Sequence, residues 1–132
     1  VLEPVRLASV AGTRHARHLY TIRLRLERLA VDRNQFVRAL GAENIGTGIH
    51  FVPIHLHRHY RETYGHRRGE YPNAEHIGDR TVSLPLSASM SEEDARDVVA
   101  AVQKIALRYR RARSVAVRRK GTGTVSPREV CA

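Results

Sequence analysis

The amino-acid sequence predicts a small α+β domain in which helices cover one face of a short antiparallel sheet of about three strands. Three observations predict this class. Apolar and polar residues alternate from Tyr20 to Leu26, which is typical of a strand with one buried face. Apolar residues recur every three or four positions after Ser91, which indicates an amphipathic helix. A length of 132 residues supports one domain with one modest core.

The elements of the first half follow from local patterns. Asp32, with Gln35 three residues later, is a capping-box pattern that predicts a short amphipathic helix. Gly41 is well placed to end that helix. Residues 45–52 are expected to form a second extended segment, which stops at Pro53 because proline has no amide hydrogen to donate.

The second half begins with residues 55–64, which predict a helix that ends at Gly65. One or two helical turns are expected over residues 73–80, followed by a third extended segment over residues 81–86. The helix that follows Ser91 is the clearest in the chain. Three acidic residues stand in its first turn, where the helix dipole favours negative charge.

The pattern divides the chain into three stretches. Residues 1–13 show no period and are expected to be a lead-in segment. Residues 14–112 contain the periodic elements and are expected to form the domain. Residues 113–132 are a basic tail without an apolar period and are expected to be mobile. The start at Val1 rather than at methionine suggests a processed or excised piece.

The charge and the cysteine content limit the kinds of partner, location and metal site that the protein can have. The formal net charge is +10, and Lys104 and Lys120 are the only lysines among the 23 basic residues. This charge permits binding to polyanions, but it is spread along the chain as far as Arg108, so a nucleic-acid partner is not expected. No apolar run is long enough to cross a bilayer. The lone Cys131 provides neither a disulfide framework nor a cysteine zinc site, so a cytoplasmic location is expected.

Four of the eight histidines lie within residues 46–60. His50 and His55 interrupt an apolar run, so each must find a hydrogen-bond partner or face a cleft. His55, His57 and His59 alternate, and on a strand they would share a face and could bind a metal. The flanking residues favour a helix, on which this spacing scatters the three side chains, and no metal site is expected.

Other motifs of catalysis are weak. Gly46, Thr47 and Gly48 are interpreted as a turn that lets the backbone pass close to a neighbour, because no phosphate-binding lysine motif follows them. Ser83 and Ser87 stand in ordinary strand-end positions without a nucleophile motif. The sequence alone therefore indicates no covalent catalysis.

Several motifs in a fixed order carry a resemblance. They are Ala-Arg-His-Leu-Tyr-Thr-Ile-Arg-Leu (16–24), Asp-Arg-Asn-Gln-Phe-Val-Arg-Ala-Leu (32–40), Asn-Ile-Gly-Thr-Gly-Ile-His-Phe-Val-Pro-Ile-His (44–55), Tyr-Arg-Glu (60–62), Tyr-Pro-Asn-Ala-Glu (71–75), Ser-Leu-Pro-Leu (83–86) and Met-Ser-Glu-Glu-Asp-Ala-Arg-Asp-Val-Val (90–99). From residue 16 to residue 105 the chain resembles the C-terminal, small domain of the DegT/DnrJ/StrS family of sugar aminotransferases.

The resemblance implies an enzyme of polysaccharide or antibiotic sugar biosynthesis. Such enzymes use pyridoxal phosphate to transfer an amino group from glutamate to a keto sugar nucleotide, and a homodimer is expected for the full enzyme. In the family, a large N-terminal domain carries the Schiff-base lysine and the phosphate cup. This chain contains none of those motifs, so no catalytic or cofactor-binding residue is expected in it. The isolated chain is expected to be inactive and to bind no pyridoxal phosphate.

The resemblance also implies a set of substrate-binding residues. It places the region of His50 and His55 at the cleft, where both help to hold the sugar nucleotide, with Tyr60 and Arg61 as weaker candidates. An equally weighted alternative for the two histidines is a hydrogen-bonded role that organises residues 46–60. The apolar face that meets the large domain is expected to drive self-association of the isolated chain.

A second function belongs to a different class. The chain could be a stand-alone basic module that binds nucleic acid or another polyanion through Arg108–Lys120. Such binding would weaken steeply with added salt.

Overall fold

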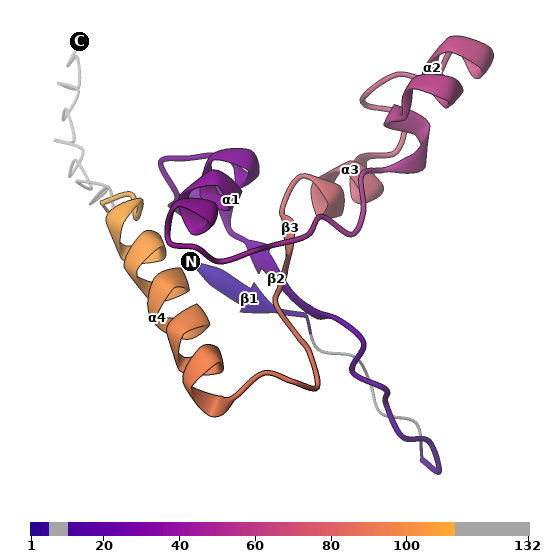
Figure 1. Ribbon diagram of the computed structural model, residues 1–132. Helices are drawn as coiled ribbons and strands as arrows, with labels where there is room; N and C mark the ends of the chain where they lie inside the picture. Colours follow the sequence, from indigo (N-terminus) through magenta and orange to yellow (C-terminus); the bar gives the residue numbers. More distant parts are fainter. Residues whose placement is uncertain (6–10, 113–132) are drawn as a thin grey trace, which may run out of the picture.

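The computed structural model describes residues 1–5 and 11–112 of the chain (Figure 1). Its strands are β1 (Leu2–Pro4), β2 (Tyr20–Leu24) and β3 (Thr81–Leu84). Its helices are α1 (Arg33–Ala42), α2 (Arg58–Tyr64), α3 (Pro72–Gly78) and α4 (Glu92–Arg108), with two short 3-10 turns, η1 (Leu26–Arg28) and η2 (Ile54–Leu56).

The three strands form one antiparallel sheet in the order β1-β2-β3, so β2 is the central strand. Leu2 pairs with Leu24 across β1 and β2, and Ile22 pairs with Val82 across β2 and β3. The predicted class, an α+β domain with a small antiparallel sheet, is confirmed.

One strand differs from the prediction. Residues 45–52 do not form a strand, because only Gly48 pairs with β3, opposite Ser83. Glycine brings no side chain to pack on a sheet, and Pro53 has no amide to donate, so the pairing does not extend.

The third strand lies instead in the stretch expected to be a lead-in. Leu2–Pro4 forms β1 at the edge of the sheet, so that interpretation is wrong for these residues. Three residues are too few to display a period of two. Pro4 is tolerated because an edge strand can leave an amide position unpaired.

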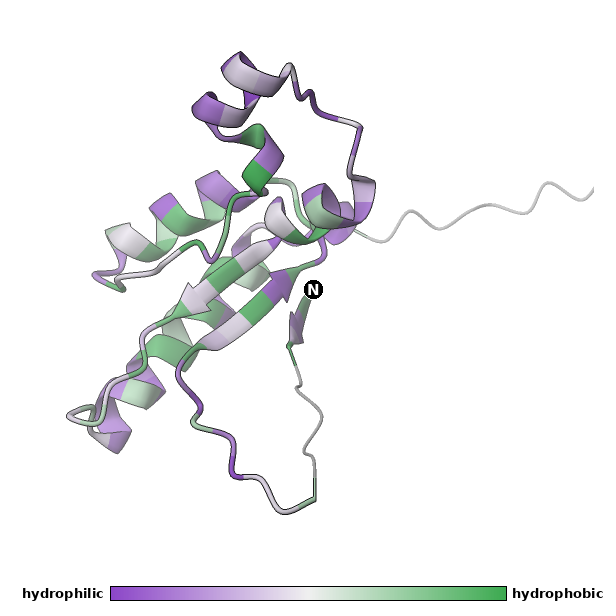
Figure 2. Cartoon of the chain, turned by 90° about the vertical axis from the view of Figure 1, so that its right-hand side faces the viewer, coloured by the Kyte–Doolittle hydropathy of each residue, from purple (hydrophilic) through white to green (hydrophobic). Residues whose placement is uncertain are grey.

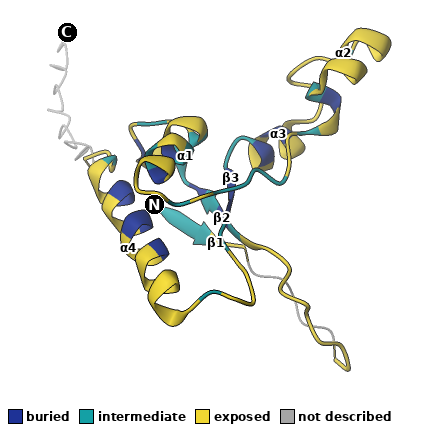
Figure 3. Ribbon diagram, viewed as in Figure 1, coloured by how far each residue is buried: buried dark blue, intermediate teal, exposed yellow. Residues whose placement is uncertain are grey.

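The core lies between one face of the sheet and two helices. α1 and α4 pack beside each other on that face (Figure 1), which confirms the predicted covering of one face. The strands alternate apolar and polar positions (Figure 2), and only the inward side of α4 is buried (Figure 3). The buried apolar residues are Ile22, Leu24, Leu29, Phe36, Leu40, Val82, Val98, Ala101, Val102, Ile105 and Ala106.

Both core helices begin where the sequence predicts. Asp32 and Ser91 each form a complete capping box, with the side chain accepting a backbone hydrogen bond from the third helical residue and that residue's side chain returning the contact. The end of α1 differs slightly from the prediction. The helix passes through Gly41 to Ala42, and Asn44 adopts the left-handed conformation with φ of 61°.

The substitution Ser91→Ala is expected to lower the free energy of unfolding by about 1 kcal/mol, because it leaves the Asp94 amide in the first turn of α4 without an acceptor. The Ser91 hydroxyl accepts from the Asp94 amide at 3.1 Å. Urea unfolding would measure the loss. Ser89→Ala is the matched control, because its hydroxyl contacts only the neighbouring Ser87. Equal stability of the two variants would contradict the prediction.

Residues 54–78, which we call the arm, project from the edge of the sheet and comprise η2, α2 and α3 (Figure 1). The helix predicted over residues 55–64 is divided, because the extended backbone of His57 separates η2 from α2. α2 ends at Gly65, which adopts the left-handed conformation with φ of 72°, as predicted. The arm contributes no residue to the buried apolar core.

Candidate functional site

A row of small polar residues crosses the face of the sheet opposite the core. Thr21 pairs with Ser83 in the register of β2 and β3, and Gly48 pairs with Ser83 from the other side. Residues directly opposite each other in a sheet share a face. The Thr21 and Ser83 hydroxyl oxygens are accordingly 3.3 Å apart. Gly48 leaves the next place in the row without a side chain.

The imidazole of His50 occupies that vacant place. Its Nδ1 lies 2.8 Å from the Ser83 Oγ. A Cβ added to Gly48 would lie 2.5 Å from the His50 Cε1, which is well inside van der Waals contact. The close approach expected within residues 46–48 is therefore seen at Gly48, where the neighbour is His50, but these residues do not form the expected turn, and a Cβ at Gly46 would meet nothing within 4 Å.

His55 has a different environment, in the arm. It is buried, and its Nε2 lies 2.9 Å from the Oε1 of Glu75 on α3, which is itself only 7% exposed. The Tyr71 ring packs on the imidazole, with ring centroids 4.7 Å apart. His55 thus has the hydrogen-bonded, organising position that the sequence left as an alternative.

Glu75 is the centre of the hydrogen bonding within the arm. Its Oε1 also accepts from the amides of Gly69 at 2.7 Å and Tyr71 at 3.4 Å, and its Oε2 lies 3.6 Å from the Arg68 guanidinium. Burial raises the pKa of the Glu75 carboxyl, but the Gly69 bond, the His55 bond and the Arg68 charge outweigh it, so the net shift is downward. The carboxylate thereby fastens α3 to η2 and to the loop before α3.

Two other carboxyls, Glu70 in the arm and Asp79 directly after it, also have lowered pKa values. The hydrogen bond from His66 lowers the pKa of Glu70, and the hydrogen bond from Arg68 lowers that of Asp79. Such groups stabilise the folded state above their unfolded pKa, and this stabilisation is lost as the pH falls through the folded pKa. The sign is the same for Glu75.

We therefore expect the arm to stay ordered above about pH 4.5, the usual pKa of a glutamate, and to loosen on further acidification before the core unfolds. Amide NMR spectra recorded from pH 6 to pH 3 would test this. Signals from α2 and α3 should change at higher pH than those from β2 and β3. One common transition for all amides would show that the arm has no acid sensitivity of its own.

An apolar pocket of 540 Å³ lies along the arm. Its lining includes His55 and Tyr60, together with Tyr71 and His66. Phe51, which is 72% exposed, forms part of the wall, and its ring contacts that of His50 with centroids 4.8 Å apart. His50 therefore reaches the pocket only through Phe51.

Arg61 faces a separate groove of 990 Å³, which shares Val52 and His66 with the apolar pocket. Arg58 and Arg68 in this groove are ion-paired, with Glu62 and Asp79 respectively. In the described part of the chain, the guanidinium groups of Arg61 and Arg67, which also line the groove, have no ion-pair or hydrogen-bond partner.

The four predicted site residues are therefore divided among three places. His55 and Tyr60 share the apolar pocket, Arg61 lines the arginine groove, and His50 lies over the polar face of the sheet. The hydrogen-bond partners of the two histidines are not apparent from the local sequence. Glu75 stands out only as the last residue of the Tyr-Pro-Asn-Ala-Glu motif, and Ser83 reads as an ordinary strand residue.

The three alternating histidines do not converge. His57 Nε2 lies 3.2 Å from the Val52 carbonyl oxygen, and His59 Nδ1 lies 3.4 Å from the Thr63 hydroxyl, while His55 contacts Glu75. Within residues 1–5 and 11–112, no three histidine, cysteine or acidic side chains are arranged to hold a metal ion.

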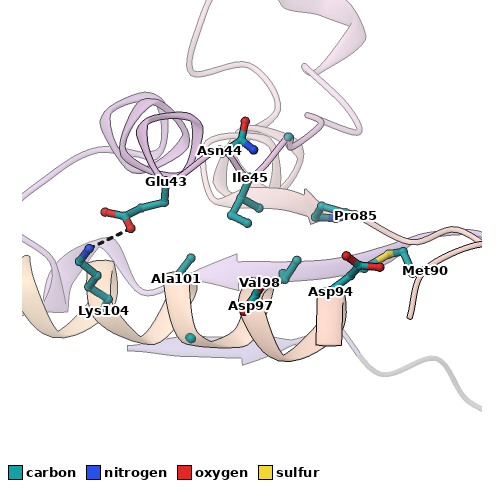
Figure 4. A pocket seen from close by; sticks show the side chains of 12 residues that line it. Glu43, Asn44, Ile45, Pro85, Met90, Asp94, Asp97, Val98, Ala101 and Lys104 are labelled. Carbon is teal, nitrogen blue, oxygen red and sulfur yellow. Dashed lines mark hydrogen bonds and ion pairs between the residues drawn. The ribbon is translucent and has the colours of Figure 1, made fainter. Parts of the chain in front are cut away.

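Lys104 is the one lysine in the described ranges, and it lies in a pocket of 590 Å³ between α4 and the segment after α1 (Figure 4). Its Nζ is 2.9 Å from the Glu43 carboxylate. Asp94 and Asp97 add two more carboxylates to the lining, which contains no arginine. This donor set does not fit pyridoxal phosphate, because the carboxylates would repel the phosphate of the cofactor.

The basic segment proposed for polyanion binding is only partly described. Arg108 ends α4, and the Arg111 amide donates to the Arg28 carbonyl oxygen at 3.0 Å, but residues 113–120 lie outside the described residues. The tail assigned to residues 113–132 also lies outside them. Among the helices that the structure does describe, none has the length and apolarity to span a membrane.

Comparison with known proteins identifies relatives of this chain. The model of the DegT/DnrJ/EryC1/StrS aminotransferase family matches residues 2–103. The chain is 46% identical over 92 residues to an uncharacterized protein of Methanocaldococcus jannaschii, and 43% identical over 93 residues to the spore coat polysaccharide biosynthesis protein SpsC of Bacillus subtilis. Each alignment covers 70% of this chain and 24% of the relative, so the chain spans about a quarter of their length.

Solved structures of sugar aminotransferases also resemble this chain in fold. The PLP form of Spr1654 from Streptococcus pneumoniae, described as a sugar aminotransferase, superposes with a TM-score of 0.69 at 24% identity, covering 81% of this chain and 26% of that one. This likeness shows that the two share a fold. With the match of the family model over residues 2–103, it follows that the chain belongs to the DegT/DnrJ/EryC1/StrS aminotransferase family.

Proposed function

We propose that this chain is the C-terminal, substrate-facing part of an aminotransferase that moves an amino group from glutamate to a keto sugar carried on a nucleotide. The family match over residues 2–103 is the observation that carries the proposal, because it includes both the polar face of the sheet and the arm. The relatives are about four times as long as the stretch that they match, which leaves room for a cofactor-binding part outside it.

The substrate contacts are assigned from the geometry. His50 lies half-buried over the polar face, where a ring nitrogen can hydrogen-bond a sugar hydroxyl. Tyr60 provides an aromatic wall in the apolar pocket. Arg61 and the neighbouring Arg67 supply unpaired guanidinium groups, which suit the phosphates of a nucleotide. His55 supports the site by holding the arm through Glu75.

Pyridoxal phosphate would supply the electron sink for amino transfer when bound elsewhere in the full enzyme. The described residues do not fit that cofactor, because the pocket of Lys104 is lined by three carboxylates and no arginine, and Glu43 already pairs with the lysine. The role of this chain is accordingly to bind and orient the sugar substrate and to exclude water from the cleft. A homodimer in the cytoplasm is the assembly we expect for the full enzyme.

The test joins this chain to the N-terminal three quarters of an active sugar aminotransferase of the family, in place of that enzyme's own C-terminal part. The fusion should convert glutamate and a nucleotide-linked keto sugar to products, and its His50→Ala variant should lose most of that activity. The unfused chain, incubated with pyridoxal phosphate and reduced with borohydride, should carry no stoichiometric adduct on Lys104 or Lys120.

Two results would overturn the proposal. The first is a fusion that binds its cofactor and folds but shows no turnover with any nucleotide-linked keto sugar. The second is a stoichiometric adduct on the unfused chain, because it would reveal a cofactor site within this stretch. A Ser87→Ala fusion serves as the matched control, since that hydroxyl bonds only within its own loop.

A further inference from the structure

We propose that Thr21 and Ser83 are positioning residues for His50: their hydroxyls hold the imidazole through Nδ1, so that Nε2 is the ring nitrogen presented to the substrate. The proposal rests on the proposed function for the identity of the substrate, but its geometric part stands on the described residues alone. The distances from Thr21 Oγ1 to Ser83 Oγ and from Ser83 Oγ to His50 Nδ1 are 3.3 and 2.8 Å.

The backbone fixes this chain of hydroxyls before any ligand arrives. The Ser83 amide donates to the Gly48 carbonyl oxygen at 2.8 Å, and the Gly48 amide donates to the Ser83 carbonyl oxygen at 2.9 Å. This pair of bonds holds residue 48 directly beside residue 83. His50 is two residues further on, and its ring lies over Gly48, where an added Cβ would be 2.5 Å from Cε1, and against the Ser83 hydroxyl.

Ser83 itself is too deeply buried to meet a substrate. It is 3% exposed, so its hydroxyl serves the neighbours that cover it and not a ligand in solution. Buried hydroxyls are normally paired, and the partners of Ser83 are Thr21 and His50. The Ser83 hydroxyl can therefore influence a bound substrate only by positioning the His50 imidazole.

The ring of His50 has one nitrogen engaged and one available. Of the two ring nitrogens of His50, only Nδ1 has a hydrogen-bond partner among the described residues. A neutral imidazole has one donor and one acceptor nitrogen, and the bond made by one nitrogen fixes the role of the other. The Thr21–Ser83–His50 chain thus holds one ring orientation. Because a hydroxyl can either donate or accept, the single tautomer is the further part of our proposal, and the ring nitrogen shifts test it.

Nitrogen-detected NMR of the full chain at pH 8.5, where a histidine is neutral, tests the geometric part. Wild type should give two well-separated ring nitrogen shifts for His50, as one tautomer requires. Ser83→Ala should bring them together as the tautomers exchange, and Ser83→Thr should restore the separation. Thr21→Val, which preserves shape in a half-buried strand position, should reduce the separation even if Ser83→Ala proves unstable.

The functional part is tested in the fusion enzyme. Ser83→Ala should lower kcat/KM for the keto sugar by about tenfold or more, because a displaced binding group misplaces the reacting atoms. The glutamate half-reaction should be unchanged. The exposed Ser87→Ala is the control in both experiments.

The outcomes separate the two proposals. Averaged nitrogen shifts for His50 in the wild type, or a tautomer that Ser83→Ala leaves unchanged, would overturn the positioning role whatever the activity of the fusion. A fixed tautomer together with a fully active His50→Ala fusion would support the positioning geometry and would overturn the substrate role assigned to His50.

Discussion

Replacing Glu75 with alanine is expected to release the arm while the sheet, α1 and α4 remain folded. The substitution removes the acceptor for the Gly69 and Tyr71 amides and leaves the buried His55 without its partner. A buried polar group without a partner is strongly unfavourable. Since no arm residue belongs to the buried apolar core, the damage should stay local.

Hydrogen–deuterium exchange at neutral pH would measure this release. Amides of α3 and of the loop before it should exchange at least about tenfold faster, while α4 is unchanged. Glu62→Ala is the matched control, because Glu62 is an exposed carboxylate of the same arm that holds only Arg58. Similar exchange in the two variants would show that the buried carboxylate does not hold the arm.

The substitution Gly78→Ala is expected to detach α3 from the segment before η2. An added Cβ would lie 2.5 Å from Pro53 Cδ, 2.8 Å from its Cγ and 3.3 Å from the Phe51 carbonyl oxygen. A proline ring and a backbone carbonyl cannot rotate aside, so one segment must shift. Overpacking of this kind costs about 1–3 kcal/mol.

Gly41→Ala is a sharp control for this substitution. Both glycines lie in helices, but a Cβ at Gly41 would meet nothing within 4 Å. Alanine there should stabilise the domain by about 0.5–1 kcal/mol through helix propensity. In urea unfolding, Gly78→Ala is expected to lower the free energy of unfolding and Gly41→Ala to raise it. Stabilisation by both would mean that the close contact at Gly78 relaxes at no cost.

The predictable parts of the fold are those whose pattern lies within a single element. α4 and α1 are fixed by their own caps and apolar periods, so both begin where the sequence predicts. β1 is three residues long and exists only because Leu24 and its neighbours pair with it. A pairing partner so distant in sequence leaves no periodic pattern within residues 2–4, so the local sequence does not predict β1.

In the candidate site, too, local sequence predicts some residues, whereas others depend on contacts between distant parts of the chain. His50 and His55 stand out because they are polar residues in an apolar run, whereas their partners Ser83 and Glu75 are 33 and 20 positions away. Nothing in the local sequence distinguishes Ser83 from an ordinary strand serine. Only the pairing of β3 with Gly48 brings it to the histidine.

Along β2 and β3, neighbouring residues lie on opposite faces of the sheet and have different roles. Ile22 and Val82 belong to the core, while Thr21 and Ser83 belong to the face that bears His50. Residues on the outer face can therefore be exchanged without repacking the interior. The same arrangement forbids a one-residue insertion or deletion within either strand, because that change would turn the core outward and the hydroxyls inward in a single step.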